Sequence, residues 1–303
     1  MRLSLQFEPI SMEHREAACD ILCKEQFGSS ESSFQSLFLW GEVHGTQVAI
    51  EDGFLFVRVG EGSRARYLFP YGAGNLCAAL EAIEADALQN GASVLLIGVT
   101  DRMRERMESV CPGRYKYEAT RDFYDYIYHA HELIELPGKK FHAKRNHVNK
   151  FMGQYAEHFQ YERIDAGNLE EVQSFQQNWV EENKTVENEK GLLAEQCVIS
   201  RAIKNYHTLG VQGGLIRIDG AVAAYSMGTR LCSESFLVEI EKGDIRYPGI
   251  YQVMNQQFAT HNCQEVRYIN REDDTGAEGL RRAKLSYQPA FLLRKYRATP
   301  KEG

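Results

Sequence analysis

The spacing of apolar residues changes along the chain in an order that occurs twice. In the first half we expect a strand over 3–7, helices over 11–27 and 32–43, a hairpin over 47–60, a strand over 64–70, a helix over 75–91, a strand over 93–100, a helix over 101–110, and an aromatic β run over 115–136 interrupted near 120–122. The residues Glu51-Asp52-Gly53 join its two apolar runs and mark the hairpin turn.

The second half repeats this order without strong sequence identity between the halves. We expect a strand over 158–165, helices over 168–183 and 191–210, a hairpin over 211–231 turning at Asp219-Gly220, a strand over 233–243, a helix over 250–262, a strand over 265–272, a helix over 276–287 and a final β segment over 289–298. Repetition of the element order indicates an internal duplication.

This order limits the topology to an α/β fold. Three antiparallel strands followed by strand, helix and strand make a mixed sheet that is covered by helices. The order resembles the acyl-CoA N-acyltransferase (GNAT) fold, present here as two tandem domains. We expect an N-terminal GNAT-like domain over 1–137, a basic linker helix over 138–157 and a C-terminal GNAT-like domain over 158–303.

Composition narrows the functional classes. With 43% hydrophobic and 25% charged residues, the chain is typical of a soluble globular protein, and no apolar run is long enough to span a bilayer. The N-terminus lacks the apolar run of a signal peptide, so a cytoplasmic location is expected. Seven scattered cysteines favour reduced structural thiols. A net charge of −7 argues against a general nucleic-acid binder but allows a local basic patch.

One segment departs from this acidity. Residues 138–151, GKKFHAKRNHVNKF, carry five Lys/Arg and no acidic residue. As a helix the segment has an apolar stripe, formed by Phe141, Val148, Met152 and Tyr155 with Arg145 in the same row, and an adjacent cationic stripe of Lys140, Lys144 and His147 flanked by Lys139 and Asn146. It is either a solvated linker helix or a site for an anion such as a polyphosphate, a lipid head group or an RNA backbone.

In the GNAT fold a pyrophosphate binds in the loop after the fourth strand, called the break below. The signature of this loop is Gln/Arg-x-x-Gly-x-Gly/Ala at a helix N-terminus. The second half has Arg246 and Gly249 in register, but Tyr251 replaces the small last residue. The first half has Gly72 and Gly74 in register, but Phe69 replaces the Gln/Arg. Both departures disfavour coenzyme A, and an ordinary strand-to-helix turn explains each break equally well.

Polar residues follow the strand that ends near Asn270. The carboxyl end of a sheet strand is where α/β folds usually bind ligands. The loop and helix that follow carry Arg271, Arg281, Arg282 and Lys284, and Tyr287 closes the helix. A phenol there is suited to protonating a leaving group, and it is equally suited to packing in a core.

Two further carboxylates, Glu239 and Glu241, share a strand face if the strand alternates regularly. One of them is suited to accepting a proton from an attacking amine, and a solvated pair is the other interpretation. No Gly-x-Ser-x-Gly motif, catalytic cysteine context or metal-ligand spacing is present, so nucleophilic and metal chemistry are not expected.

The segments GKKFHAKRNHVNKF and YINREDDTGAEGLRRAKLSYQPAFLLRKY together resemble the phosphatidylglycerol lysyltransferase C-terminal-domain family. The resemblance implies two GNAT-like domains, similar to Fem-type aminoacyltransferases. In relatives that modify lipids, it implies transfer of an aminoacyl group from aminoacyl-tRNA to a phosphatidylglycerol head group. Those relatives carry a multi-span membrane part that this sequence lacks.

Two hypotheses follow. In the first, the chain is an acyl- or aminoacyltransferase in which the acceptor attacks directly, with aminoacyl-tRNA fitting the family and acetyl-CoA fitting the fold. In the second, it is a non-catalytic module that binds an anion. The expected catalytic residues are Tyr287, Glu239, Glu241 and Asn270, and the expected anion-binding residues are Lys139, Lys140, His142, Lys144, Arg145, Asn146, His147, Arg246, Gly249, Arg271, Arg281 and Lys284.

Overall fold

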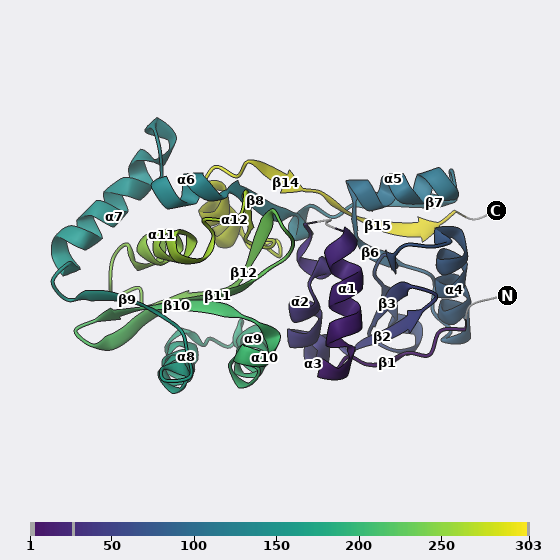
Figure 1. The fold of residues 1–303 in the computed structure, drawn as a ribbon, viewed down its shortest axis with the longest axis horizontal. Coiled ribbons are helices and arrows are strands. Elements are labelled where there is room, and N and C mark those ends of the chain that lie inside the picture. The colour runs from purple at the N-terminus through teal and green to yellow at the C-terminus, as the bar shows by residue number, and fades with distance from the viewer. Residues whose placement is uncertain (1–3, 26–27, 302–303) are drawn as a thin grey trace. The chain divides into compact units, whose positions relative to one another are not determined.

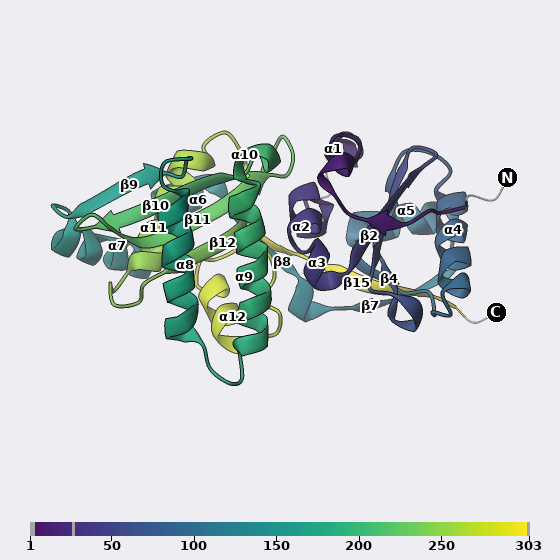
Figure 2. The same ribbon diagram turned by 90° about the horizontal axis from the view of Figure 1, so that it is seen from below.

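The computed structural model describes residues 4–25 and 28–301 (Figures 1 and 2). The chain forms two compact units, each assembled from stretches that are far apart in sequence. The first contains Met1–Asp125, Asp273–Glu278 and Leu292–Gly303, and the second contains Tyr126–Glu272 and Gly279–Phe291. The domain ranges expected from the sequence are continuous, whereas both of these units are discontinuous.

The first unit is built on an eight-stranded mixed sheet with the order β1-β2-β3-β4-β6-β15-β7, in which β5 also pairs with β3. Its strands are β1 (Glu8–Pro9), β2 (Thr46–Glu51), β3 (Phe54–Val59), β4 (Arg66–Tyr67), β5 (Tyr71–Gly72), β6 (Leu96–Thr100), β7 (Tyr115–Ala119) and β15 (Lys295–Pro300). Its helices are α1 (Arg15–Glu25), α2 (Phe34–Leu39), α3 (Gly41–His44), α4 (Leu76–Gln89) and α5 (Asp101–Val110). Helices α1 and α4 lie on opposite sides of β2 and β3 in both views.

The second unit is built on a seven-stranded mixed sheet with the order β14-β8-β13-β12-β11-β10-β9. Its strands are β8 (Asp125–His129), β9 (Phe159–Arg163), β10 (Gln212–Ile218), β11 (Ala221–Arg230), β12 (Ser235–Gly243), β13 (Tyr268–Asn270) and β14 (Phe291–Leu293). Its helices are α6 (Ala130–Glu135), α7 (His142–Tyr155), α8 (Leu169–Asn183), α9 (Glu189–Lys204), α10 (Tyr206–Leu209), α11 (Ile250–Asn262) and α12 (Glu278–Leu285). Helices α8 and α9 cover one face of the sheet, and α11 with α6 and α7 covers the other (Figures 1 and 2).

The predicted fold class is confirmed, because both units have the expected element order. In each, antiparallel strands lead to a parallel pair joined by a helix: β4 and β6 through α4, and β12 and β13 through α11. Both hairpins turn at the predicted Asp-Gly pairs. Asp52 and Gly53 have φ of 48° and 75°, and Asp219 and Gly220 have 51° and 82°, as the two central residues of a type I′ turn require.

The structure corrects two predicted elements. The end of the predicted aromatic β run is helix α6, because Ala130 and Leu133 lie on one helical face and are buried, and Leu136 ends the helix with a positive φ. The strand predicted over 3–7 is absent from residues 4–7; the first strand is Glu8–Pro9, and residue 3 lies outside the described part of the chain. Of the helix predicted over 11–27, residues 26 and 27 lie outside it as well.

The last strand of each half pairs in the sheet of the other half. Strand β15 lies between β6 and β7 and is antiparallel to both. Strand β8 lies in the second sheet beside β13, where Tyr128 is opposite Ile269. Each sheet is therefore completed by a strand that the sequence places at the end of the other half.

A buried ion cluster fixes β15 in the first unit. The Lys295 ammonium group, with no exposed side-chain surface, lies 2.7 Å from Asp125 Oδ1 and 2.7 Å from Glu31 Oε2, and donates to Ser30 Oγ at 3.0 Å. Burial alone would lower the pKa of Lys295, but Asp125 and Glu31 raise it above its ordinary value. Asp273 lies near this cluster, and burial raises its pKa to about 6.

In the described part of the chain, no helix combines the length and the apolar character needed to cross a bilayer.

We predict that Lys295→Met destabilises the first unit by about 3–5 kcal/mol, because it leaves buried carboxylates without their cation. Urea unfolding followed by circular dichroism would measure the loss as a lower midpoint. Arg297→Met is the matched control, since Arg297 is exposed on the same strand, and we expect it to change stability by less than about 0.5 kcal/mol. Equal midpoints for the two variants would contradict the prediction.

Candidate functional site

Three adjacent strands of the second unit bring together residues that are far apart in sequence. In the order β8-β13-β12, Tyr128 comes from β8, Arg271 follows β13, and Glu241 lies in β12. The backbone N–H of Arg271 donates to the Tyr126 carbonyl at 3.0 Å, which continues the ladder past the end of β13. The sheet therefore positions a guanidinium beside a carboxylate and an aromatic ring.

The Arg271 side chain is the centre of this cluster. Its Nη2 donates to Glu241 Oε1 at 2.8 Å, and both side chains are nearly buried. The guanidinium carbon lies 5.2 Å from the centre of the Tyr287 ring and 5.9 Å from that of Tyr128, within the range of cation–π attraction. The two rings meet edge to face with centroids 6.5 Å apart.

Only one of the two carboxylate oxygens of Glu241 has a hydrogen-bond partner among the described residues. Its Oε1 accepts from Arg271, while its Oε2 is buried and has no hydrogen-bond partner among the described residues. A buried polar atom without a partner is uncommon in native proteins and is costly unless a ligand or water completes it. This oxygen therefore has unused hydrogen-bonding capacity within the cluster.

Tyr287 lies just beyond α12 and is 6% exposed. Burial raises the pKa of its phenol above the ordinary value; Arg271 opposes the shift and Glu241 adds to it. The phenol therefore stays protonated at neutral pH and is able to donate. The turn that carries Tyr287 is held by Lys284, whose carbonyl accepts from Tyr128 Oη at 2.7 Å and whose ammonium group donates to the Arg271 carbonyl at 2.5 Å.

Lys144, from helix α7, reaches this cluster. Its Nζ donates to Ser286 Oγ at 2.6 Å and lies 3.9 Å from the centre of the Tyr287 ring. Partial burial and, to a smaller extent, the charge of Arg271 together lower the pKa of Lys144 to about 8. Two cations, a protonated phenol and a carboxylate thus share one cluster, an arrangement suited to an anion or to a polarised carbonyl.

The other basic residues of the segment 138–151 have different surroundings. Arg145 donates to the carbonyls of Leu136 and Gly138, the latter at 2.7 Å, so it caps the chain after α6. Lys140 pairs with Glu132 at 2.6 Å. The exposed side chains of this helix and the turn before it include Lys139, His142, Asn146, His147 and Lys150, with His142 and Asn146 in contact at 3.1 Å.

The apolar anchors of this helix differ from the predicted stripe. Phe141 and Phe151 are fully buried, whereas Val148, Met152 and Tyr155 are only half buried. The predicted stripe omitted Phe151.

The regular alternation predicted for Glu239 and Glu241 is interrupted in β12. Met227 pairs with Ile240 and Gly228 with Val238, which leaves a β-bulge at Glu239.

In the first half, a carboxylate of the chain itself binds the backbone of the glycine-containing break. The Gly72 N–H donates to Glu25 Oε1 at 2.9 Å, and Arg106 binds both Glu25 and the Gly72 carbonyl. Gly72 has a φ of 141°, and a Cβ there would lie 2.3 Å from the Gly53 carbonyl oxygen. The glycine therefore serves close packing, and Glu25 occupies the N–H group that an anion would use.

The break in the second half is packed against α7. Gly249, the N-cap of α11, has a φ of 98°, and a Cβ there would lie 3.0 Å from the His147 carbonyl oxygen. Arg246, which the signature assigns to a phosphate, lies 2.7 Å from Asp244. These contacts account for the Arg-x-x-Gly spacing without a phosphate.

The remaining predicted residues hold the loop after β13. Asn270 is fully buried, and its Oδ1 accepts from the Glu272 N–H at 2.7 Å, which stabilises the positive φ of Glu272. Arg281 is half buried on α12. Asn270 thus shapes the turn that presents Arg271.

The sequence interpretation missed Tyr128, Ser286 and Glu25. Tyr128 belonged to an aromatic run that gave no sign of which sheet it would join. Ser286 directly precedes Tyr287, and the dense motif around that residue was the available signal. Glu25 ends a helix, and nothing near it in sequence indicates a contact with Gly72.

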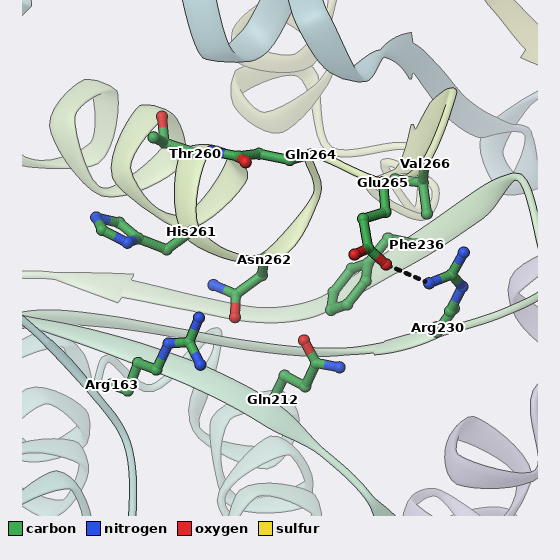
Figure 3. A pocket seen from close by; sticks show the side chains of 10 residues that line it. All are labelled: Arg163, Gln212, Arg230, Phe236, Thr260, His261, Asn262, Gln264, Glu265 and Val266. Carbon is green, nitrogen blue, oxygen red and sulfur yellow. Dashed lines mark hydrogen bonds and ion pairs between the residues drawn. The ribbon is translucent and has the colours of Figure 1, made fainter.

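Two cavities of the second unit lie away from this cluster. One, of about 350 Å³, is lined by the polar residues Arg163, Gln212, Arg230, His261, Asn262 and Glu265 among others, with Arg230 and Glu265 3.3 Å apart (Figure 3). The other, of about 370 Å³, includes His131, Glu135 and Arg267. No residue predicted to form the site lines either of them.

Comparison with known proteins identifies relatives of the chain. The sequence profile of the family described as "Phosphatidylglycerol lysyltransferase, C-terminal" matches residues 25–299, which confirms the resemblance seen in the sequence. An uncharacterized protein of Mycoplasmoides gallisepticum is 26% identical over 182 residues, which are 57% of this chain and 54% of that protein. The match thus spans about half the length of that relative.

Solved structures share the fold over nearly the whole chain. A conserved protein of unknown function from Bacteroides thetaiotaomicron is 34% identical, with a TM-score of 0.92 and coverage of 98% of this chain and 100% of that one. The C-terminal domain of a putative lysylphosphatidylglycerol synthetase from Agrobacterium fabrum is 13% identical, with a TM-score of 0.69 and coverage of 96% and 93%. L-PGS from Bacillus licheniformis is 14% identical, with a TM-score of 0.67 and coverage of 98% and 93%.

We predict that Lys144 titrates near pH 8 in the folded protein, because partial burial and Arg271 disfavour its charged form. Only the neutral amine reacts with an acylating reagent, so the labelling rate of Lys144, followed by peptide mass spectrometry, should reach half its maximum at about pH 8. In the urea-unfolded chain the same residue should titrate near the ordinary lysine value of about 10.4. Identical midpoints in the folded and unfolded chains would contradict this.

Proposed function

Because this chain belongs to the phosphatidylglycerol lysyltransferase C-terminal family, we propose that it is an acyltransferase that moves an aminoacyl group from aminoacyl-tRNA to an amine or hydroxyl acceptor. The observation that carries the proposal is the buried cluster of the second unit. There one oxygen of Glu241 has no hydrogen-bond partner among the residues that the structure describes, and it lies beside Arg271, Tyr287 and Lys144. Such a cluster supplies a proton acceptor, a proton donor and two cations within one site.

In the proposed reaction the acceptor attacks the aminoacyl ester directly. Glu241 Oε2 takes the proton of the attacking amine or hydroxyl as the new bond to the carbonyl carbon forms. Lys144 and Arg271 stabilise the negative charge that develops on the carbonyl oxygen. The ester bond then breaks, and the Tyr287 phenol protonates the ribose oxygen of the leaving tRNA. The proton held by Glu241 restores the phenol, and the enzyme forms no covalent intermediate.

The exposed face of α7 is the proposed contact for the donor. His142, His147 and Lys150 are exposed on this helix, and Lys139 is exposed in the turn that precedes it. A phosphodiester backbone binds such a surface through charge, with an affinity that falls as salt rises. Lys140 and Arg145, which the sequence also assigned to phosphates, pair with Glu132 and with backbone carbonyls, so we assign them to holding the helix in place.

A coenzyme A donor is the alternative that the fold alone would suggest. The contacts of Glu25 with Gly72 and of His147 with Gly249 disfavour it, because they use the loop positions on which a pyrophosphate would depend. A non-catalytic anion-binding module is the second alternative. The unpartnered oxygen of Glu241 favours catalysis, since anion binding alone has no use for a buried carboxylate.

We predict transfer of labelled amino acid when the protein is incubated with charged tRNA and a panel of acceptors, including phosphatidylglycerol vesicles and small amines. Glu241→Gln and Tyr287→Phe should each lower kcat by about 10²-fold or more, because each removes one proton transfer, while tRNA affinity stays unchanged. Glu265→Gln, on the surface of the same unit, is the control and should leave kcat unchanged. Product analysis by mass spectrometry would identify the acceptor.

Each alternative has its own outcome. Turnover of acetyl-CoA without turnover of charged tRNA would support the coenzyme A alternative. Binding of tRNA without transfer, unaffected by Tyr287→Phe, would support the non-catalytic module. Absence of both tRNA binding and transfer would overturn the proposal.

A further inference from the structure

Two cysteines of the first unit lie close together although 34 positions separate them in sequence. Cys77 is in the first turn of α4, and Cys111 follows the last residue of α5. Their sulfur atoms are 2.8 Å apart, whereas a disulfide bond measures about 2.05 Å. A shift of less than about 1 Å would therefore bring the sulfurs to bonding distance. All seven cysteines are free thiols in the structure.

The surroundings of the pair favour thiol chemistry. Arg114 Nη1 lies 3.9 Å from the sulfur of Cys77 and 4.0 Å from that of Cys111, and its guanidinium is anchored by Glu84. A nearby cation stabilises a thiolate, which is the reactive form. The two thiols differ in exposure, since Cys77 is half buried and Cys111 is buried. Burial and the contact with Cys77 raise the pKa of Cys111 to about 11, and Arg114 opposes the shift.

We propose that Cys77 and Cys111 are a redox-responsive pair that forms a reversible disulfide under peroxide. Cys77, the more accessible thiol, attacks hydrogen peroxide as its thiolate; an S–O bond forms, the O–O bond breaks, and hydroxide leaves. The sulfur of Cys111 then attacks the sulfenic acid, the S–S bond forms, and water leaves. Two thiols and one peroxide give one disulfide and two waters. A dithiol reductant reverses the reaction.

The position of the pair gives the disulfide a structural consequence. Cys77 follows the N-cap residue Asn75 by two positions, directly after the turn that contains Gly72. The bond would join the start of α4 to the end of α5 and close a loop across β6. Closing such a loop lowers the entropy of the unfolded chain and so stabilises the first unit. This inference does not depend on the proposed transfer reaction.

The test uses the full chain, reduced and then treated with a stoichiometric amount of hydrogen peroxide. We expect a Cys77–Cys111 linked peptide that is two hydrogens lighter, as detected by mass spectrometry after alkylation of the remaining thiols. Dithiothreitol should restore both thiols. The oxidised protein should melt at a temperature about 5 °C higher than the reduced protein.

Matched variants separate this pair from the other thiols. Cys77→Ser and Cys111→Ala should each abolish both the linked peptide and the shift in melting temperature. Cys23→Ser, which removes an exposed thiol of α1, should preserve both. If Cys111→Ala folds poorly, Cys77→Ser decides alone, because its side chain is half buried. The proposal would be overturned if Cys77 were recovered as a sulfinic acid while Cys111 remained a thiol that the reagent alkylates. A disulfide between either residue and any other cysteine would overturn it as well.

Discussion

The ammonium group of Lys295 joins parts of the first unit that lie far apart in the chain. It binds Glu31 near the N-terminus, Asp125 at the start of β8, and Ser30, while the strand it begins completes the sheet between β6 and β7. Such a cluster is stable only when every charge is matched, because each buried ion has lost its hydration. Correct placement of the last strand therefore requires that all these partners be present together.

This constraint extends to the stretch that carries Tyr287. Residues 279–291 fold into the second unit, yet the residues on both sides of them fold into the first. On one side buried Asp274 lies 3.2 Å from Arg121, and on the other side Lys295 is held in its cluster. Both ends of the stretch are therefore fixed by ion pairs. A stretch anchored at its two ends loses less entropy when it orders Tyr287 than a free tail would.

The charged clusters around Lys295 and Arg271 obey the same electrostatics but differ in how completely their polar atoms are paired. Around Lys295, both carboxylate oxygens of Glu31, one of Asp125 and the hydroxyl oxygen of Ser30 lie within 3.0 Å of one ammonium group. Around Arg271 one oxygen of Glu241 is paired and the other is not. A structural cluster gains stability from complete pairing, whereas a site that binds a ligand keeps a polar atom whose partner arrives with that ligand. This difference in the pairing of buried polar atoms distinguishes the candidate site from the structural cluster.

Local patterns in the sequence were sufficient for most of the elements and insufficient for their partners. The Asp-Gly turns, the element order and the duplication could be predicted, because each depends on residues close together in sequence. The exchange of β8 and β15 could not, since an apolar strand carries no mark of the sheet it will join. For the same reason the site prediction included Arg271, Glu241, Lys144 and Tyr287 but missed Tyr128.

The contacts made by the two glycine-containing breaks indicate how a GNAT-like fold could use a donor other than coenzyme A. A helix N-terminus attracts anions through its free N–H groups, and this attraction persists whichever anion is present. In the first unit Glu25, a carboxylate of the chain itself, accepts from the N–H of Gly72 in β5, ahead of α4, and Arg106 balances its charge. In the second unit the backbone of α7 lies against Gly249. Exposed cationic side chains, among them Lys139 and Lys150, lie on α7 and the turn before it, where an extended polyanion could follow them. Under the proposed function, that placement is the physical reason why a GNAT-like unit would accept a charged tRNA in place of coenzyme A.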